Sequence, residues 1–207
     1  MYSDVLTRLR ERRGVYDFEF DRVYSEELQR VSAFFWTPVS VAVRAAELLV
    51  QGPSTRVLDV GSGAGKFCLV GAAATGASFT GVEHRERFVR AASASARALG
   101  LESVSFIHDN FDRVDVSAFD ALYFFNPFEE NIWYPHDQID HSVELSEDRY
   151  LTDIARAERL LHRARAGTRV ATYHGFGGVM PSSYRLELEE RRHSGVLALW
   201  VKGGDAA

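Results

Sequence analysis

The sequence predicts an α/β fold: a doubly wound, mostly parallel seven-strand sheet with a C-terminal antiparallel hairpin and an N-terminal helical extension. From Thr55 onward, short apolar runs alternate with longer helical segments, a pattern typical of parallel strands joined by crossover helices. Only residues 191–194 join the last two apolar runs, which is too short for a crossover and indicates a hairpin. We expect a helical extension or lid over residues 1–50 and one sheet domain over residues 51–207.

The extension is expected to contain several helices. Apolar residues recur at helical spacing among the charges of residues 1–13, and a short helix is expected over Ser25–Phe35. A longer helix follows Thr37, the expected N-cap, and Pro38, which a first helical turn tolerates. This helix should end near Gly52.

The sheet domain should alternate strands and helices. Strands are expected at Arg56–Val60, Ser78–Val82, Ser103–Ile107, Phe119–Phe125, Thr168–Tyr173, Tyr184–Glu190 and Gly195–Val201. Helices are expected at Lys66–Ala74, Arg85–Leu99 and Asp148–Ala166, the last two ending before a glycine.

Composition excludes several classes of protein. The chain has one cysteine, Cys68, which excludes an internal disulfide framework. No apolar run approaches the roughly 20 residues of a membrane span, and the N-terminus is too charged for a signal peptide. The net charge of -5 provides no overall positive field for nucleic acid. We therefore expect a cytoplasmic protein without a membrane partner, and nucleic acid is a possible but not a favoured partner.

The strongest local signal is the glycine-rich stretch after the first expected strand. Gly61, Gly63 and Gly65 lie between a buried strand and a helix, where an open α/β sheet binds ligands. A phosphate-binding P-loop has a longer gap between its glycines, and a Ser or Thr where this chain has Phe67. A dinucleotide-binding loop has a third glycine where this chain has Lys66, a residue that we expect to point to solvent.

The spacing Asp59-x-Gly61-x-Gly63-x-Gly65 resembles the first motif of class I S-adenosylmethionine-dependent methyltransferases. The resemblance implies that residues 51–207 bind S-adenosylmethionine. A carboxylate in this turn suits that cofactor, which carries an ammonium and a sulfonium. The cofactor-binding residues expected in the loop are Asp59, Gly61, Ser62, Gly63 and Gly65.

The ends of the next two expected strands extend the resemblance. Glu83 ends the second strand, where the family's acid accepts hydrogen bonds from the ribose hydroxyls. Asp109 follows the third strand, where the family's acid holds the adenine amino group, and Phe111 can pack on the ring. The resemblance thus adds Glu83, His84, Asp109, Asn110 and Phe111 to the expected cofactor site.

Asn126-Pro127-Phe128, after the fourth expected strand, resembles a shortened Asn/Asp-Pro-Pro-Tyr/Phe motif of N-methyltransferases. In that family the Asn side chain and the adjoining Pro carbonyl accept hydrogen bonds from the target nitrogen, and the aromatic ring stacks on the target. Lysine methyltransferases with a seven-strand sheet also carry an Asn-centred motif here. We therefore expect Asn126, Pro127 and Phe128 to be catalytic, with Asn126 also touching the cofactor. The missing second proline puts a DNA base in doubt as the substrate.

Two further positions are candidates. Trp36 and Thr37 resemble part of the segment that closes over the methionine end of the cofactor in adenine amino-methyltransferases. His174, just after the fifth expected strand, lies where a general base could remove a proton from an ammonium. A histidine that caps the strand fits this position equally well.

The segment 129–148 is acidic and carries Trp133 and Tyr134, which favours a cationic acceptor. The expected activity is therefore methyl transfer to an amine nitrogen of a protein lysine or a smaller molecule. Two alternatives stay open: a nucleobase methyltransferase, for which Arg8, Arg10, Arg12 and Arg13 could supply a positive surface, and a binding module that transfers no methyl. His136-Asp137 and Asp140-His141 could in principle ligate a metal, but we expect none.

Overall fold

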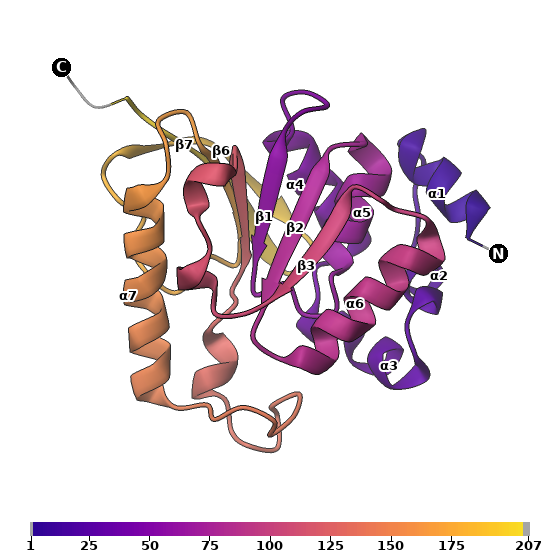
Figure 1. Cartoon of the computed structure of the whole chain (residues 1–207), viewed down its shortest axis with the longest axis horizontal. Coiled ribbons are helices and arrows are strands. Elements are labelled where there is room, and N and C mark those ends of the chain that lie inside the picture. Colours follow the sequence, from indigo (N-terminus) through magenta and orange to yellow (C-terminus); the bar gives the residue numbers. More distant parts are fainter. Residues whose placement is uncertain (1, 205–207) are drawn as a thin grey trace.

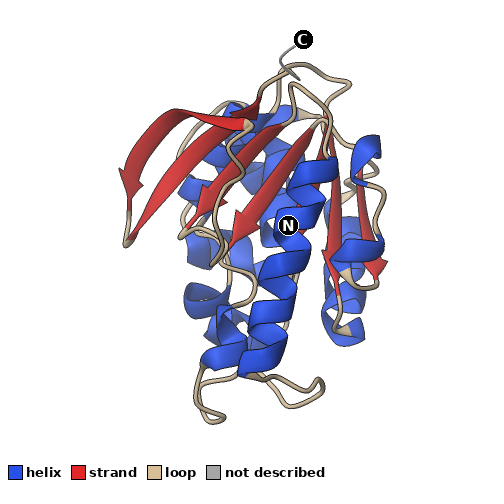
Figure 2. Ribbon diagram, turned by 90° about the vertical axis from the view of Figure 1, so that its left-hand side faces the viewer, coloured by secondary structure: helices blue, strands red, loops and turns tan. Residues whose placement is uncertain are grey.

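The structure, a computed structural model of the chain, describes residues 2–204 as one seven-stranded sheet with helices on both faces (Figures 1 and 2). The strand order is β3-β2-β1-β4-β5-β7-β6, and only β7 runs against its neighbours. The prediction of a doubly wound sheet with a C-terminal hairpin is confirmed. The strands are β1 (Arg56–Val60), β2 (Ser78–Glu83), β3 (Val104–His108), β4 (Ala121–Phe125), β5 (Arg169–Tyr173), β6 (Tyr184–Arg192) and β7 (Gly195–Lys202).

The helices agree with the expected segments to within a few residues. The α-helices are α1 (Ser3–Arg10), α2 (Asp17–Phe20), α3 (Glu26–Phe35), α4 (Val39–Leu49), α5 (Lys66–Thr75), α6 (Glu86–Leu99) and α7 (Glu147–Arg163). Short 3-10 helices are η1 (Asp21–Val23), η2 (Phe111–Arg113), η3 (Val116–Ala118) and η4 (Glu129–Ile132). Among the described residues, no helix has the length and apolar character needed to span a bilayer.

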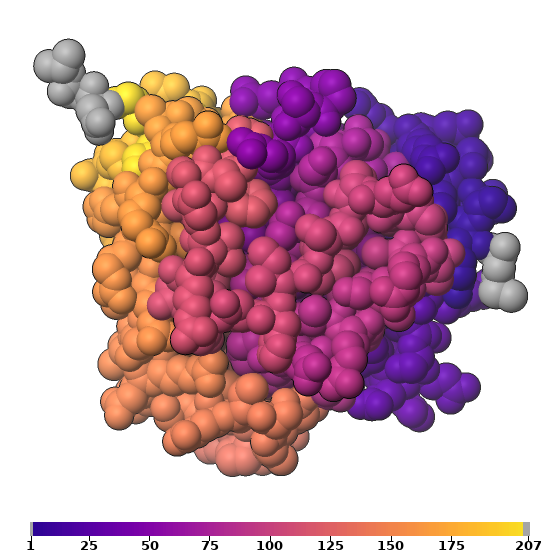
Figure 3. Space-filling model, in the orientation of Figure 1, coloured from indigo at the N-terminus to yellow at the C-terminus, as the bar shows by residue number. Residues whose placement is uncertain are grey.

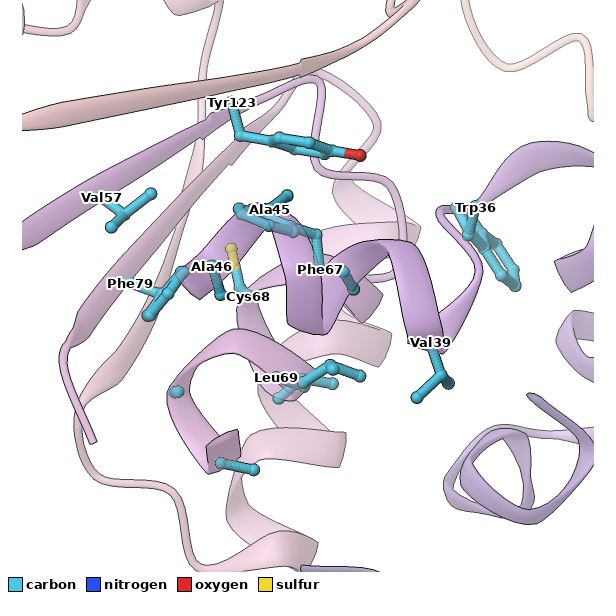
Figure 4. Packing of buried hydrophobic residues seen from close by; sticks show 14 of the residues in the cluster. Trp36, Val39, Ala45, Ala46, Val57, Phe67, Cys68, Leu69, Phe79 and Tyr123 are labelled. Carbon is cyan, nitrogen blue, oxygen red and sulfur yellow. The ribbon is translucent and has the colours of Figure 1, made fainter. Parts of the chain in front are cut away.

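The sheet separates two hydrophobic clusters because successive side chains of a strand point to opposite faces. Val57 of β1 packs in the cluster formed with α4, α5 and α6, whereas Leu58 packs in the cluster formed with α7. On the first face the ring of Phe67 stacks on Tyr123 of β4, with 3.7 Å between centroids (Figure 4). Burial on both faces explains why the central strands are continuous apolar runs.

The glycine-rich loop lies at the point where the chain changes direction across the sheet. β1 pairs in parallel with both β2 and β4, so the chain first builds β2 and β3 on one side and then crosses to β4 on the other. Open α/β sheets bind ligands at the carboxyl ends of the strands that flank such a switch point. The fold therefore brings the residues that follow β1, β2 and β4 to one place.

The helical extension is tied to the start of α5 by a buried charge cluster. Lys66 is 1% exposed, and its Nζ lies 2.6 Å from Asp17 Oδ1, 2.8 Å from Asp21 Oδ1 and 2.9 Å from Ser32 Oγ. The prediction that Lys66 points to solvent is therefore wrong. Its partners come from α2, η1 and α3, so no pattern near Lys66 could reveal them.

The N-terminus of α4 also differs from the prediction. Pro38, not Thr37, occupies the N-cap position, and Asp17 Oδ1 accepts a hydrogen bond from the N–H of Val39 at 2.9 Å. The hydroxyl of Thr37 instead lies 2.9 Å from the hydroxyl of Tyr123 inside the core. A buried tyrosine hydroxyl needs a partner, which accounts for the different role of Thr37.

Candidate active site

A pocket of about 980 Å³, counted with the solvent at its mouth, lies where β1, β2 and β4 end. The structure brings together at this pocket most of the residues singled out in the sequence: Trp36, Gly61, Gly63, Glu83, His84, Asp109, Asn110, Phe111, Asn126, Pro127 and Phe128.

Glycine is needed at two positions of the loop, because the backbone is left-handed there and neighbouring side chains leave no room for a Cβ atom. Gly61 and Gly63 have φ values of 74° and 51°, in the left-handed region that favours glycine. A Cβ atom on Gly61 would lie 2.7 Å from Pro127 Cβ, and one on Gly63 would lie 2.5 Å from Trp36 Nε1. The loop is therefore confined between the helical extension and the segment that follows β4.

Backbone amides of the loop already have acceptors within the protein. The N–H groups of Gly61 and Ser62 each donate to the carbonyl oxygen of Val82 at 3.0 Å. The N–H of Gly63 donates to Glu83 Oε2, also at 3.0 Å. A phosphate-binding loop needs free amides that converge on the anion. These engaged amides agree with the exclusion of a P-loop from the sequence.

Glu83 is buried at the end of β2 and lines the pocket. It is 5% exposed, and its Oε1 accepts a hydrogen bond from the N–H of Arg85 at 2.8 Å. Burial raises the pKa of this carboxyl group, and the two backbone donors act against that rise. Each carboxylate oxygen keeps a second lone pair, which is available to a hydroxyl group of a ligand.

Asp109, His84 and Phe111 form the neighbouring part of the pocket wall. Asp109 Oδ1 accepts the N–H of Asn110 at 2.7 Å and lies 3.1 Å from a guanidinium nitrogen of Arg113. Burial, together with nearby cations, lowers the pKa of His84 to about 3, so its imidazole is neutral. The ring of Phe111 packs against Phe128 at 5.2 Å, which joins this wall to the segment after β4.

Asn126 is held in a special backbone conformation directly after β4. Its φ is 40°, in the left-handed region that Asn tolerates better than most residues. The N–H of Asn126 donates to the carbonyl oxygen of Gly175 at 3.0 Å, and its side-chain Nδ2 donates to Glu129. These contacts fix both the backbone and the amide of Asn126 at the pocket.

Asp59 lies behind the pocket and does not line it. Its side chain is buried beneath the glycine loop, where Cys68 Sγ approaches Oδ2 at 3.5 Å. Burial raises the pKa of Asp59 to about 7. Asp59 is therefore an expected site residue that does not line the pocket, and its contact with the cofactor stays a prediction.

Four other expected site residues also lie outside the pocket: Thr37, Ser62, Gly65 and His174. Thr37 is bonded in the core, and a Cβ atom on Gly65 would meet the ring of Phe106 rather than a ligand. His174, at a φ of 58°, packs against Gly195 of the hairpin and against the ring of Tyr173. This position fits a histidine that ends a strand, and it places no base at the pocket.

The structure also shows pocket residues that sequence reasoning missed. Phe34 and Phe35 end α3 directly before Trp36, and Glu129 and Asn131 lie just after Phe128. Phe34 and Phe35 were signalled only by their closeness to Trp36, whereas Glu129 and Asn131 belong to the acidic segment 129–148 that the sequence had already indicated. The full additional lining is Phe34, Phe35, Val82, Arg85, Phe88, Phe125, Glu129, Glu130, Asn131, Trp133, Ile139, Arg149 and Asp153.

The acidic segment 129–148 lies at the lower edge of the molecule in Figure 3 and contributes several residues to the pocket. Two of its acids form ion pairs with arginines: Glu130 lies 3.0 Å from Arg85, and Asp140 contacts both Arg85 and Arg87. These ion pairs tie the segment to the residues that follow β2. Only part of its negative charge is therefore available to a substrate.

Comparison with protein-family models assigns the chain to a class. The family described as a methyltransferase domain matches residues 51–158, more than half of the chain. The chain belongs to this methyltransferase family. No curated protein matches the sequence of the methyltransferase.

Solved structures share the fold of this methyltransferase at low identity. An RNA methyltransferase of Salinibacter ruber in complex with S-adenosyl-L-homocysteine is 18% identical, with a TM-score of 0.62 over 83% of this chain and 95% of that one. TrmN of Thermus thermophilus is also 18% identical, with a TM-score of 0.62 over 80% of this chain and 49% of that one. MtNAS in complex with MTA and tNA is 15% identical, with a TM-score of 0.56 over 97% and 76%. Structural similarity at such low sequence identity shows the fold alone.

S-adenosylmethionine is the methyl donor of the methyltransferase, and the pocket residues fit it. Two glycines of the loop lie at the pocket, and the N–H groups of Gly61 and Ser62 already donate within the protein. This arrangement suits a cationic cofactor better than an anionic one. Glu83 and Asp109 supply acceptors for hydroxyl and amino groups, and Phe111 supplies an aromatic face.

Proposed function

We propose that this methyltransferase transfers a methyl group from S-adenosylmethionine to an amine nitrogen, carried by a protein lysine or a smaller molecule. The position of Asn126 supports this most directly. Asn126 lines the pocket next to the glycine loop, and both its backbone and its amide are held by hydrogen bonds. A pocket that served only to bind the cofactor would not need this arrangement.

The cofactor end of the pocket is assigned to residues that follow β1, β2 and β3. Gly61 and Gly63 would let the cofactor approach the backbone, Glu83 would accept hydrogen bonds from its ribose hydroxyls, and Asp109 would accept one from its adenine amino group. S-adenosylmethionine, when bound, supplies an electrophilic methyl group. Trp36 would close this end, because its ring packs against Gly63. In this sense residues 1–50 act as a lid.

The acceptor end is assigned to the residues after β4. Asn126 Oδ1 and the carbonyl oxygen of Pro127 would accept the N–H bonds of the amine and so direct its lone pair. Phe128 and Phe111 would form the apolar wall beside it. The contribution of these residues to catalysis would be positioning, which can supply a large part of a rate enhancement.

The position of the N-terminal arginines argues against a nucleobase acceptor. Arg8 and Arg13 are paired with Glu19 and Glu11, at 2.6 and 2.7 Å, whereas Arg10 makes no ion pair within residues 2–204. None of the four arginines, Arg8, Arg10, Arg12 and Arg13, lines the pocket. A nucleic-acid surface near the site would need unpaired cations that follow the phosphates. Glu129, a pocket acid that makes no ion pair within residues 2–204, would repel such a backbone instead.

Labelled methyl transfer to a cell extract tests this proposal. The wild-type protein should label material that survives nuclease treatment, and Asn126→Ala should lower the labelling by about 100-fold or more, because the acceptor nitrogen loses its partner. Calorimetry should show that Asn126→Ala still binds S-adenosylhomocysteine. Unchanged turnover in Asn126→Ala, or label that only nuclease removes, would refute the proposal.

A further inference from the structure

One carboxylate in the pocket differs from the others in its surroundings. The remaining acids that line the pocket each meet an arginine or a backbone N–H group: Glu83, Asp109, Glu130 and Asp153. Within residues 2–204, Glu129 Oε2 accepts a hydrogen bond from Asn126 Nδ2, and Oε1 accepts none. Glu129 makes no ion pair in this part of the chain. Its negative charge is therefore available to a ligand.

The contact with Glu129 also decides how the amide of Asn126 is oriented. An ionised carboxylate only accepts hydrogen bonds, so the NH2 group of Asn126 must face Glu129. The amide oxygen of Asn126 is then left as a free acceptor. Glu129 Oε1 and Asn126 Oδ1 therefore both remain as acceptors for a ligand in the pocket.

A second side chain that lines the pocket, Asn131, has a buried acceptor atom without a hydrogen-bond donor among the described residues. Asn131 is 8% exposed and lines the pocket, and its Nδ2 donates to the carbonyl oxygen of Phe128 at 2.9 Å. Its buried Oδ1 has no hydrogen-bond partner in the described structure. A buried acceptor without a donor is unfavourable, so a ligand that brings an N–H group to it gains affinity.

We propose that Glu129 binds the acceptor in its primary ammonium form and takes its proton, with Asn131 Oδ1 accepting a second N–H. This assignment rests on the proposed function. In the step, one N–H bond of the ammonium breaks, an O–H bond forms on Glu129 Oε1, and the electron pair stays on nitrogen as its lone pair. The neutral amine that results remains hydrogen-bonded to Asn126 Oδ1.

The rim of the pocket indicates what carries the ammonium. Phe34 is 77% exposed at the mouth, and Phe35 packs against Trp133 with 5.6 Å between ring centroids. Aromatic faces attract both cations and apolar groups. A primary amine attached to an apolar or aromatic group fits this rim together with the acceptors inside.

Ligand binding to the full chain saturated with S-adenosylhomocysteine tests this inference. Calorimetry would compare benzylammonium with neutral benzyl alcohol in wild type, Glu129→Gln and the control Glu144→Gln. Glu144 is an exposed residue of the same segment and does not line the pocket. We expect wild type and Glu144→Gln to prefer benzylammonium, and Glu129→Gln to lose about tenfold or more of that preference.

Affinity for S-adenosylhomocysteine should be unchanged in Glu129→Gln. An equal preference for benzylammonium in wild type and Glu129→Gln would overturn the assignment. A parallel loss of S-adenosylhomocysteine affinity would also overturn it, because Glu129 would then hold the cofactor.

Methyl transfer separates a failure of this inference from a failure of the proposed function. Benzylamine is charged near neutral pH and aniline is not, so Glu129→Gln should slow transfer to benzylamine much more than transfer to aniline. Equal slowing of both amines overturns the role of Glu129 alone. Transfer to RNA but to neither amine overturns the proposed function itself.

Discussion

Burial changes the protonation of single residues near the site, and Asp59 is the clearest case. It is buried, its hydrogen bond comes from a thiol, and burial raises its pKa to about 7. Asp59 therefore retains a proton in conditions where an exposed aspartate has lost it. A cofactor cation bound nearby would favour release of that proton.

The stability of the free protein should depend on pH through Asp59. The folded state keeps this carboxyl protonated up to about pH 7, whereas the unfolded chain ionises near 3.8, so folding takes up a proton between these values. The stability from this group is fully present below the unfolded pKa and is lost as pH rises through the folded one. Thermal unfolding of Asp59→Asn should show an advantage over wild type that grows from about pH 5 to about pH 7.5. A difference that does not change with pH would contradict this reading.

The glycines offer a matched pair of substitutions. Gly63 and Gly76 have φ values of 51° and 74°, but only at Gly63 does a Cβ atom meet another side chain, that of Trp36. Both alanine variants should lose about 1–2 kcal/mol of stability from the left-handed backbone. Only Gly63→Ala should also weaken binding of S-adenosylhomocysteine, by about tenfold or more, because Trp36 is displaced. Calorimetry on both variants checks this, and equal binding by the two would count against Trp36 as a wall of the site.

Among the elements, the contact between the helical extension and α5 matters most for the site. Lys66 opens α5 directly after the glycine loop, and it is held by Asp17 and Asp21 of the extension. Asp17 also accepts the N–H of Val39 at the start of α4. The placement of Trp36, which lies between these elements, thus depends on buried ionic contacts.

Removing the cation from this cluster should destabilise the protein. Lys66→Met leaves the buried Asp21 without its partner and should lower the free energy of unfolding by about 3–5 kcal/mol. Arg90→Met, which removes an exposed pair with Glu86, should cost less than about 1 kcal/mol. Urea unfolding measures both, and adding Asp21→Asn to Lys66→Met should recover part of the loss. Similar small effects of the two single variants would contradict the buried role of Lys66.

For the whole molecule, the sheet and its order were predictable because each strand is marked by a local pattern. Continuous apolar runs such as Ala121–Phe125 need burial on both faces, and the short connection before Gly195 permits only a hairpin. The placement of the candidate site followed from the same logic. Residues after parallel strands meet at one edge of the sheet, so Gly61, Glu83 and Asn126 could be expected at one pocket.

What the sequence did not reveal depends on partners far along the chain. The residues next to Lys66 and Thr37 in the sequence give no sign that these side chains are buried. Their partners, Asp21 and Tyr123, lie far away in the chain. His174 lies after a strand, as expected, but it is exposed beside Gly195 of the hairpin and does not line the pocket. Long-range packing of this kind leaves no periodic trace in the sequence.

We propose that the glycine loop and Glu83 bind S-adenosylmethionine in this pocket. Calorimetric titration with S-adenosylhomocysteine tests it most directly, with NAD as the competing ligand class and Glu83→Ala and Glu86→Ala as variants. Glu86 is exposed and does not line the pocket, so its variant is a matched control. We expect a dissociation constant on the order of a micromolar, weakened about tenfold or more only in Glu83→Ala. Binding of NAD without binding of S-adenosylhomocysteine would contradict it.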